Sequence, residues 1–261
     1  MCWILEGVGP EIQHTSGIEW TNYLDEEKPD GSVNLVAREI SDHGKIVERI
    51  LWKNGARNGI QREWYKNGQA KREAPYENDL MNGVFREWNP AGALIGQYVI
   101  TKGEGIIVVY NSRGELAREE HIKHNESEGL VVRRESDHLS FGWARHGVYK
   151  GKSFEIYLNG DVAEVSTMTA TGEPSGVIVR FQKLNPSPFA EWFLKGRPTT
   201  AEKYAEAARD DVSLPAYYED LNRYKEILDD SDHALAARYL AMKRVKIPLQ
   251  FDAAGRPLLA E

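Results

Sequence analysis

Pairs of glycines nine residues apart recur along the middle of the chain, and this spacing constrains the fold more than any other feature. The pairs are Gly59/Gly68, Gly83/Gly92, Gly105/Gly114 and Gly151/Gly160. The first glycines of successive units are Gly59, Gly83, Gly105, Gly129, Gly151 and Gly176, at intervals of 22 to 25 residues. A degenerate unit precedes them at residues 35–44. Self-similarity at a nearly fixed period predicts an array of repeated structural units.

Each repeat carries the signals of a β-hairpin. Apolar and polar residues alternate with period two, as Ile60, Arg62 and Trp64 illustrate, and this alternation predicts strands. Asn-Gly pairs such as Asn54-Gly55 lie at the joints and supply the positive φ angles of tight turns. The sequence therefore predicts a mainly β chain whose residues 35–188 form an elongated antiparallel meander of about six to seven hairpin repeats.

The segments on either side of the array have a different texture. Residues 1–34 are expected to cap one end, with Trp3, Ile4, Leu5 and Trp20 available for packing. Residues 189–261 are expected to form a helical region, in which 189–194 is an aromatic docking segment. We expect exposed tyrosines on these helices, and we expect the helical region to cap the other end of the array.

Capping signals place three short helices and a hairpin in this C-terminal region. Thr199 or Thr200 is expected to cap a helix over residues 201–209. Pro215 predicts the first turn of a second helix. Ser231 or Asp232 is expected to cap a third. Residues 247–259 alternate around a glycine turn and predict a small final hairpin.

Composition narrows the classes of function. The net charge is −7, and no stretch concentrates lysine and arginine as phosphate contacts require, so we expect no nucleic-acid partner. Acidity either steers a basic protein toward the chain or simply keeps it soluble. Cys2 is the single cysteine, and no segment is apolar and long enough to be a signal peptide or to span a bilayer. These features predict a cytoplasmic protein without a transmembrane segment.

The clearest repeat, Gly59-Ile-Gln-Arg-Glu63-Trp64-Tyr65-Lys-Asn67-Gly68, resembles the units of the MORN-variant repeat family. Other units share an acidic position (Glu63, Glu87, Glu155) and an aromatic position (Trp64, Trp88, Tyr110). The unit at Gly129 departs from this pattern, with Arg134 at the aromatic position. The resemblance implies a bacterial antitoxin or immunity-type protein that neutralises a cognate toxin by direct binding. It supplies no catalytic residues.

The candidate partner-binding residues are Glu63, Tyr65, Glu87, Glu155 and Tyr157. The recurring acidic residues form a possible recognition strip, and we expect Arg38, Arg62 and Arg86 to share their surface and balance their charge. We expect Trp64, Trp88 and Tyr110 to be structural, because a hairpin array has little other core.

Catalytic and metal-binding patterns are weak in this sequence. His121-x-x-His124 lacks a third ligand at a recognisable spacing, and Asp137-His138 lacks a nucleophile. We therefore predict no enzyme activity, no cofactor and no metal. Two alternatives stay open. One is a general scaffold or interaction protein, for which a membrane surface is one place of action, and the other is an enzyme whose site lies where the helical region joins the sheet. The acidic balance disfavours anionic lipid as a ligand. The oligomeric state is left open.

Overall fold

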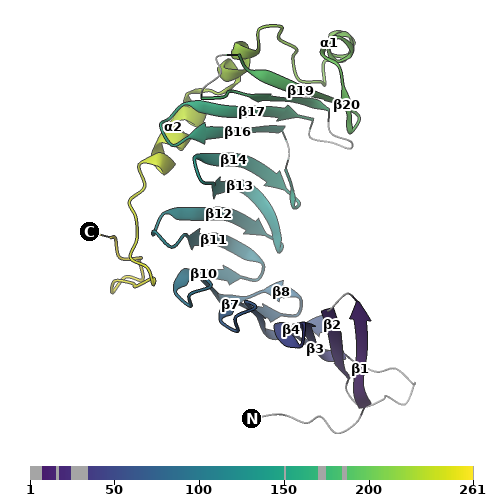
Figure 1. Cartoon of the computed structure of the whole chain (residues 1–261), viewed down its shortest axis with the longest axis vertical. Helices are drawn as coiled ribbons and strands as arrows, with labels where there is room; N and C mark the ends of the chain where they lie inside the picture. The colour runs from purple at the N-terminus through teal and green to yellow at the C-terminus, as the bar shows by residue number, and fades with distance from the viewer. Residues whose placement is uncertain are drawn as a thin grey trace. The chain divides into compact units, whose positions relative to one another are not determined.

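A computed structural model describes residues 8–15, 18–24, 35–149, 151–169, 175–183 and 187–260. These residues form a chain of antiparallel strands with helices near the C-terminus, as the sequence predicts (Figure 1). The expected packing residues Trp3, Ile4 and Leu5 lie outside the described ranges. The chain divides into two compact units. Unit 1 comprises Met1–Glu115, Ile122–Asn125 and Arg244–Glu261, and unit 2 comprises Leu116–His121 and Glu126–Lys243.

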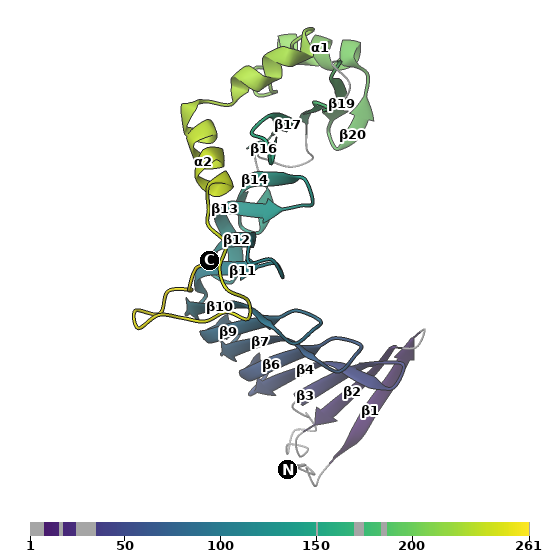
Figure 2. The ribbon, with the colours of Figure 1, turned by 60° about the vertical axis from the view of Figure 1, so that its left-hand side comes forward.

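Unit 1 is built from hairpins that pair with their neighbours in chain order (Figure 2). Its strands are β1 (Val8–Thr15), β2 (Ile18–Leu24), β3 (Leu35–Asp42), β4 (Lys45–Lys53), β5 (Ala56–Arg57), β6 (Gly59–Trp64), β7 (Ala70–Glu77), β8 (Leu80–Met81), β9 (Gly83–Trp88), β10 (Leu94–Thr101) and β11 (Glu104–Tyr110). The turn between β4 and β5 confirms the expected Asn-Gly chemistry at one pair, because Asn54 and Gly55 both have positive φ, 54° and 80°. At the other expected pairs only the glycine has positive φ, and the asparagines Asn67, Asn82 and Asn159 do not.

Unit 2 continues the same hairpin construction and adds the helices. Its elements are β13 (Glu126–Arg134), β14 (His138–Arg145), β15 (Val148–Tyr149), β16 (Gly151–Tyr157), β17 (Val162–Met168), β18 (Gly176–Arg180), β19 (Phe189–Leu194), β20 (Arg197–Thr199), α1 (Ala201–Asp210), the 3₁₀ helix η1 (Leu221–Ile227) and α2 (Asp230–Leu240). Strand β12 (Leu116–Lys123) contributes residues to both units. The aromatic segment 189–194 is strand β19, which pairs with β18.

In each unit, one face of the β-sheet carries the buried core residues. In unit 1, Phe85 and Tyr98 stack at 5.4 Å between ring centroids, and Ile100 and Ile107 are buried beside them. In unit 2, Phe141 and Phe154 stack at 4.8 Å. Successive strand residues point to opposite faces, so neighbours such as Glu155 lie on the other, more exposed face.

The helical tyrosines are buried, which corrects the expectation that they are exposed. Tyr204, Tyr224 and Tyr239 have relative exposures of 0%, 0% and 1%. Trp192 on β19 contacts the rings of Tyr204 and Tyr224, at 5.0 and 6.1 Å between centroids. Phe141 meets the ring of Tyr239 edge-on at 5.7 Å. Their rings therefore extend the core of unit 2, since bulky aromatics bury more apolar area there than on an open surface.

The predicted helix starts meet mixed outcomes. Thr200 caps α1 as expected, because its side chain accepts a hydrogen bond from the Lys203 backbone. The prediction of a helix beginning at Pro215 is wrong. The carbonyls of Pro215 and Ala216 accept hydrogen bonds from the hydroxyls of Tyr204 and Tyr224 (2.8 and 3.0 Å), and these bonds hold the segment in a non-helical path.

The other two C-terminal predictions concern the last helix and the final hairpin. Ser231 and Asp232 do not cap the third helix, because the Asp229 carboxylate accepts from both of their backbone N–H groups. Asp232 closes a capping box by accepting from the Asp229 backbone at 2.9 Å. The final hairpin is confirmed by the bridge between Phe251 and Pro257.

Candidate functional site

A pocket of about 300 Å³ opens on the polar face of unit 2, over strands β14, β16, β17 and β18. Register places four side chains in one row across these strands, in the order Ser140, Glu155, Glu164 and Arg180. The residues that line the pocket are Asp137, His138, Glu155, Tyr157, Ala163, Glu164, Arg180, Phe181, Gln182 and Phe189. The pocket thus combines an acidic floor with an aromatic rim, and we call it the acidic pocket.

Glu155 is the carboxylate with the least charge compensation in the acidic pocket. It lies directly opposite Glu164 on the next strand, and like charges in that position repel. Its ion-pair contact in the described part of the chain is with His138 Nε2, at 3.4 Å. Burial, followed by the charge of Glu164, raises the pKa of Glu155. Among the described residues, the Glu155 carboxylate therefore has no lysine or arginine as an ion-pair partner, although its pKa is raised by burial and by a neighbouring negative charge.

The neighbouring cations are already engaged. Arg180 donates to Glu164 at 2.8 Å and to Glu191 at 2.6 Å. Lys183 Nζ lies 3.5 Å from the carboxylate of Asp137. Because these bonds direct the guanidinium and the ammonium to other carboxylates, they leave room beside Glu155 for a cation from outside.

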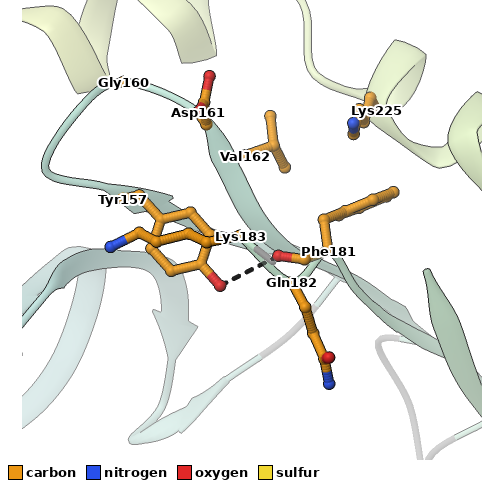
Figure 3. Close-up of a pocket in the computed structure, with 8 residues that line it drawn as sticks. All are labelled: Tyr157, Gly160, Asp161, Val162, Phe181, Gln182, Lys183 and Lys225. Atoms are coloured by element: carbon orange, nitrogen blue, oxygen red, sulfur yellow. Dashed lines mark hydrogen bonds between the residues drawn. The ribbon is translucent and has the colours of Figure 1, made fainter. Parts of the chain in front are cut away.

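A second pocket of about 460 Å³ adjoins the first (Figure 3). The two pockets share Tyr157, Phe181 and Gln182, and the Tyr157 hydroxyl donates to the Phe181 carbonyl at 3.0 Å. Lys183 Nζ lies 4.2 Å from the centre of the Tyr157 ring, and Lys225 Nζ lies 4.5 Å from the centre of the Phe181 ring. We call this cavity the lysine pocket.

No family model matches the chain, and no curated protein matches it.

Two of the five predicted partner-binding residues, Glu155 and Tyr157, meet at these pockets. The other three lie on unit 1, where each makes an internal contact. Glu63 pairs with Lys71 at 2.7 Å, Glu87 accepts from a tyrosine hydroxyl at 2.7 Å, and Tyr65 donates to the Trp88 carbonyl at 2.8 Å.

Sequence reasoning missed Phe181, Lys183 and Lys225 as site residues, and it placed Phe189 in the docking segment 189–194 without assigning it to a site. The pattern that contained Phe181 indicated only a strand. Lys225 comes from η1, far along the chain, and no spacing connects it to the repeats.

The expected sharing of a surface by the repeat arginines and glutamates is wrong. Arg62 and Glu63 are consecutive in β6, so their side chains point to opposite faces. Arg72 on β7 instead lies opposite both Glu63 and Glu87. The charge of the acidic strip in unit 1 is therefore balanced by the intervening strand.

Tyr65 and Tyr157 hold equivalent positions, since each donates its hydroxyl to a backbone carbonyl of the following repeat. We expect Tyr65→Phe to lower the free energy of unfolding by about 1 kcal/mol, because the partly buried Trp88 carbonyl loses its donor. Urea unfolding followed by fluorescence measures this loss. Tyr149→Phe is the control, since Tyr149 is 53% exposed. An equal effect of the two changes would show that the bond adds nothing.

The two histidine motifs noted in the sequence, His121-x-x-His124 and Asp137-His138, do not form a metal-binding cluster in the described ranges. Within the described ranges, no group of three or more His, Cys, Asp or Glu side chains is placed to hold a metal ion. His121 contacts Glu119 at 3.4 Å, and His138 contacts Asp137 at 2.9 Å. In the same ranges, no helix is long and apolar enough to cross a membrane.

Proposed function

We propose that this chain is a non-catalytic, cytoplasmic protein-binding repeat protein that neutralises a cognate toxin by direct binding. The observation that carries the proposal is the half-buried Glu155 carboxylate, which faces Glu164 beneath an aromatic rim. Such a pocket suits a lysine or arginine side chain of a partner. The likeness of the repeats to the MORN-variant family supplies the neutralising role.

The chemistry of the acidic pocket favours arginine. A guanidinium beside Glu155 would relieve its repulsion with Glu164 through charge-assisted hydrogen bonds. The rings that rim the pocket already carry cations of this chain, so they offer the partner's side chain apolar contact for its methylene groups. Arginine and aromatic residues are the commonest anchors of protein interfaces, and losing one side of a buried charge pair typically costs about 2–5 kcal/mol of binding. The net charge of −7 adds long-range attraction for a basic partner.

The test compares the wild-type chain with Glu155→Gln, which keeps the shape of the side chain and removes its charge. The tagged protein captures partners from native lysate, the captured proteins are identified by mass spectrometry, and the affinity of the best stoichiometric partner is measured by calorimetry. We expect Glu155→Gln to weaken that affinity at least tenfold, by about 1.4 kcal/mol or more. The captured protein should also stop cell growth when expressed alone, and co-expression of the wild-type chain should restore growth.

The control is Glu206→Gln, because Glu206 lies exposed on α1 outside both pockets. It should leave the affinity unchanged. Equal affinity of Glu155→Gln and the wild type would exclude the acidic pocket as the partner site. A captured partner that is harmless when expressed alone would contradict the neutralising role.

Acidity should weaken the complex through Glu155. Burial and Glu164 raise the pKa of this carboxyl, so it loses its negative charge on acidification sooner than an exposed glutamate does. The affinity for a cationic partner should therefore fall as the pH drops through the raised pKa. In Glu155→Gln this part of the pH dependence should disappear, and its persistence would assign the titration to another group.

A further inference from the structure

The lysine pocket is a built cationic site rather than a chance pair of surface lysines. Lys183 follows β18 and Lys225 belongs to η1, yet both ammonium groups rest on rings that wall one cavity (Figure 3). Tyr224, which precedes Lys225, is fully buried, and it fixes the position of η1 on the sheet. The Tyr157 ring is fixed by its hydrogen bond to Phe181. The ring under Lys225 is therefore part of the core, and the ring under Lys183 is held in place by a hydrogen bond.

The charge of the lysine pocket is incompletely neutralised. Lys225 Nζ has no carboxylate within ion-pair distance in the part of the chain that the structure describes. Lys183 Nζ lies 3.5 Å from the carboxylate of Asp137, which does not line this pocket. Asp161 lines the pocket, but its carboxylate accepts from the Asn159 side chain at 2.7 Å within its own turn. Lys225 thus brings to the pocket an ammonium group without a carboxylate partner in the described ranges, whereas the Lys183 ammonium is shared with Asp137.

We infer that the lysine pocket binds a carboxylate of the same partner segment whose basic side chain enters the acidic pocket. This inference rests on the proposed function and names the chemistry of the partner more closely. A carboxylate forms charge-assisted hydrogen bonds with an ammonium group, and Lys225 offers such a group at this cavity. The partner is therefore a peptide segment that carries a cation and an anion close together.

The adjacency of the two pockets keeps these charges within one short segment of the partner. Tyr157, Phe181 and Gln182 belong to both linings, so a bound segment passes from one pocket to the other across a single wall. The carboxylate is therefore either an acidic side chain near the arginine or lysine in the partner's sequence, or the C-terminus of the partner.

Three short peptides measure separately what the partner's cation and what its carboxylate contribute to binding. Acetyl-Arg-Gly with a free C-terminus offers both charges, the same peptide with an amidated C-terminus offers only the cation, and acetyl-Gln-Gly with a free C-terminus offers only the anion. Each is titrated into the ¹⁵N-labelled full chain, and dissociation constants are taken from the shifts of the backbone amides. We expect the free-acid arginine peptide to bind about tenfold more tightly than its amide, as one added charge-assisted contact allows.

Lys225→Gln assigns that gain to the lysine pocket, with Lys203→Gln as its matched control. Lys225 is exposed, so its replacement should leave the protein folded and its amide spectrum well dispersed. Lys203 lies on α1 outside the pocket. The tenfold preference should vanish in Lys225→Gln and persist in Lys203→Gln. A preference that survives Lys225→Gln, or no preference in the wild type, would overturn the inference.

The same titrations distinguish failure of the inference from failure of the proposed function. If the amidated arginine peptide binds better than the glutamine peptide but gains nothing from a free carboxylate, the acidic pocket stands and the lysine pocket is not a carboxylate site. If the two free-acid peptides, with arginine and with glutamine, bind alike, or if none binds, the cation site at Glu155 fails, and with it the inference built on it.

Discussion

Replacing Gly114 with alanine should destabilise unit 1 by about 3 kcal/mol, as the sum of two separate costs. Gly114 has φ of +75°, a left-handed conformation that costs an L-residue about 1–2 kcal/mol. In addition, an added Cβ would lie 2.0 Å from the carbonyl oxygen of Val245. The C-terminal segment must therefore move, and it would give up the hydrogen bond from the Val245 backbone to the Gly114 carbonyl at 2.9 Å.

Gly68→Ala is the matched control for this prediction. Gly68 holds the equivalent repeat position, nine residues after the first glycine of its unit, and has φ of +84°. An alanine Cβ at that position would meet nothing within 4 Å, so only the backbone cost remains. Urea unfolding measures both losses, and hydrogen exchange at Val245 reports whether the C-terminal segment has detached. Equal losses in the two variants would mean that the contact with Val245 contributes nothing.

Phe141→Ala should destabilise unit 2 by about 3–5 kcal/mol, the usual cost of emptying a large buried aromatic site. Phe141 is 1% exposed and packs between the Phe154 ring on β16 and the Tyr239 ring on α2. Its loss removes the ring contact with Tyr239, one of the contacts that join this helix to the sheet beside the hydrogen bond from the Tyr239 hydroxyl to Glu119. The midpoint of urea unfolding should fall, and amide protection in α2 should fall with it.

The control repeats the same substitution at an exposed phenylalanine. Phe189 is 42% exposed on β19, so Phe189→Ala should cost no more than about 1 kcal/mol. If Phe141→Ala proves as mild as Phe189→Ala, the α2 contact is not part of the cooperative core. Retention of α2 protection in the Phe141 variant would point to other contacts as the ones that hold the helix.

The hairpin architecture could be predicted from the sequence because its signals are local. Glycine spacing and Asn-Gly pairs set turn geometry within a few residues, and the structure confirms them at Asn54 and Gly55. The cap of α1 at Thr200 was predictable for the same reason. Where a distant group competes for the backbone, local signals fail. The Tyr204 hydroxyl takes the Pro215 carbonyl, and no helix begins at Pro215.

The candidate site was only partly predictable, because its members come from separate elements. Glu155 and Tyr157 stood out through the repeat pattern, whereas Lys225 lies 68 residues beyond Tyr157 and joins it only through folding. The face of the sheet on which each charged side chain lies could not be predicted either. Repeats show which residues alternate, but strand register decides that Arg72, rather than Arg62, faces Glu63. Strand register depends on which residues of separate strands pair, and a single sequence does not show that pairing directly.

The tyrosine bonds between repeats also bear on how such a chain can lengthen. Tyr65 reaches the carbonyl of Trp88, and Tyr157 reaches that of Phe181, 23 and 24 residues onward. A gene segment that encodes either of these two repeats therefore carries a donor for the copy after it and an acceptor for the copy before it. Tandem duplication of that segment joins old and new copies by the same bond, so the array can gain or lose whole hairpins without a new junction having to evolve.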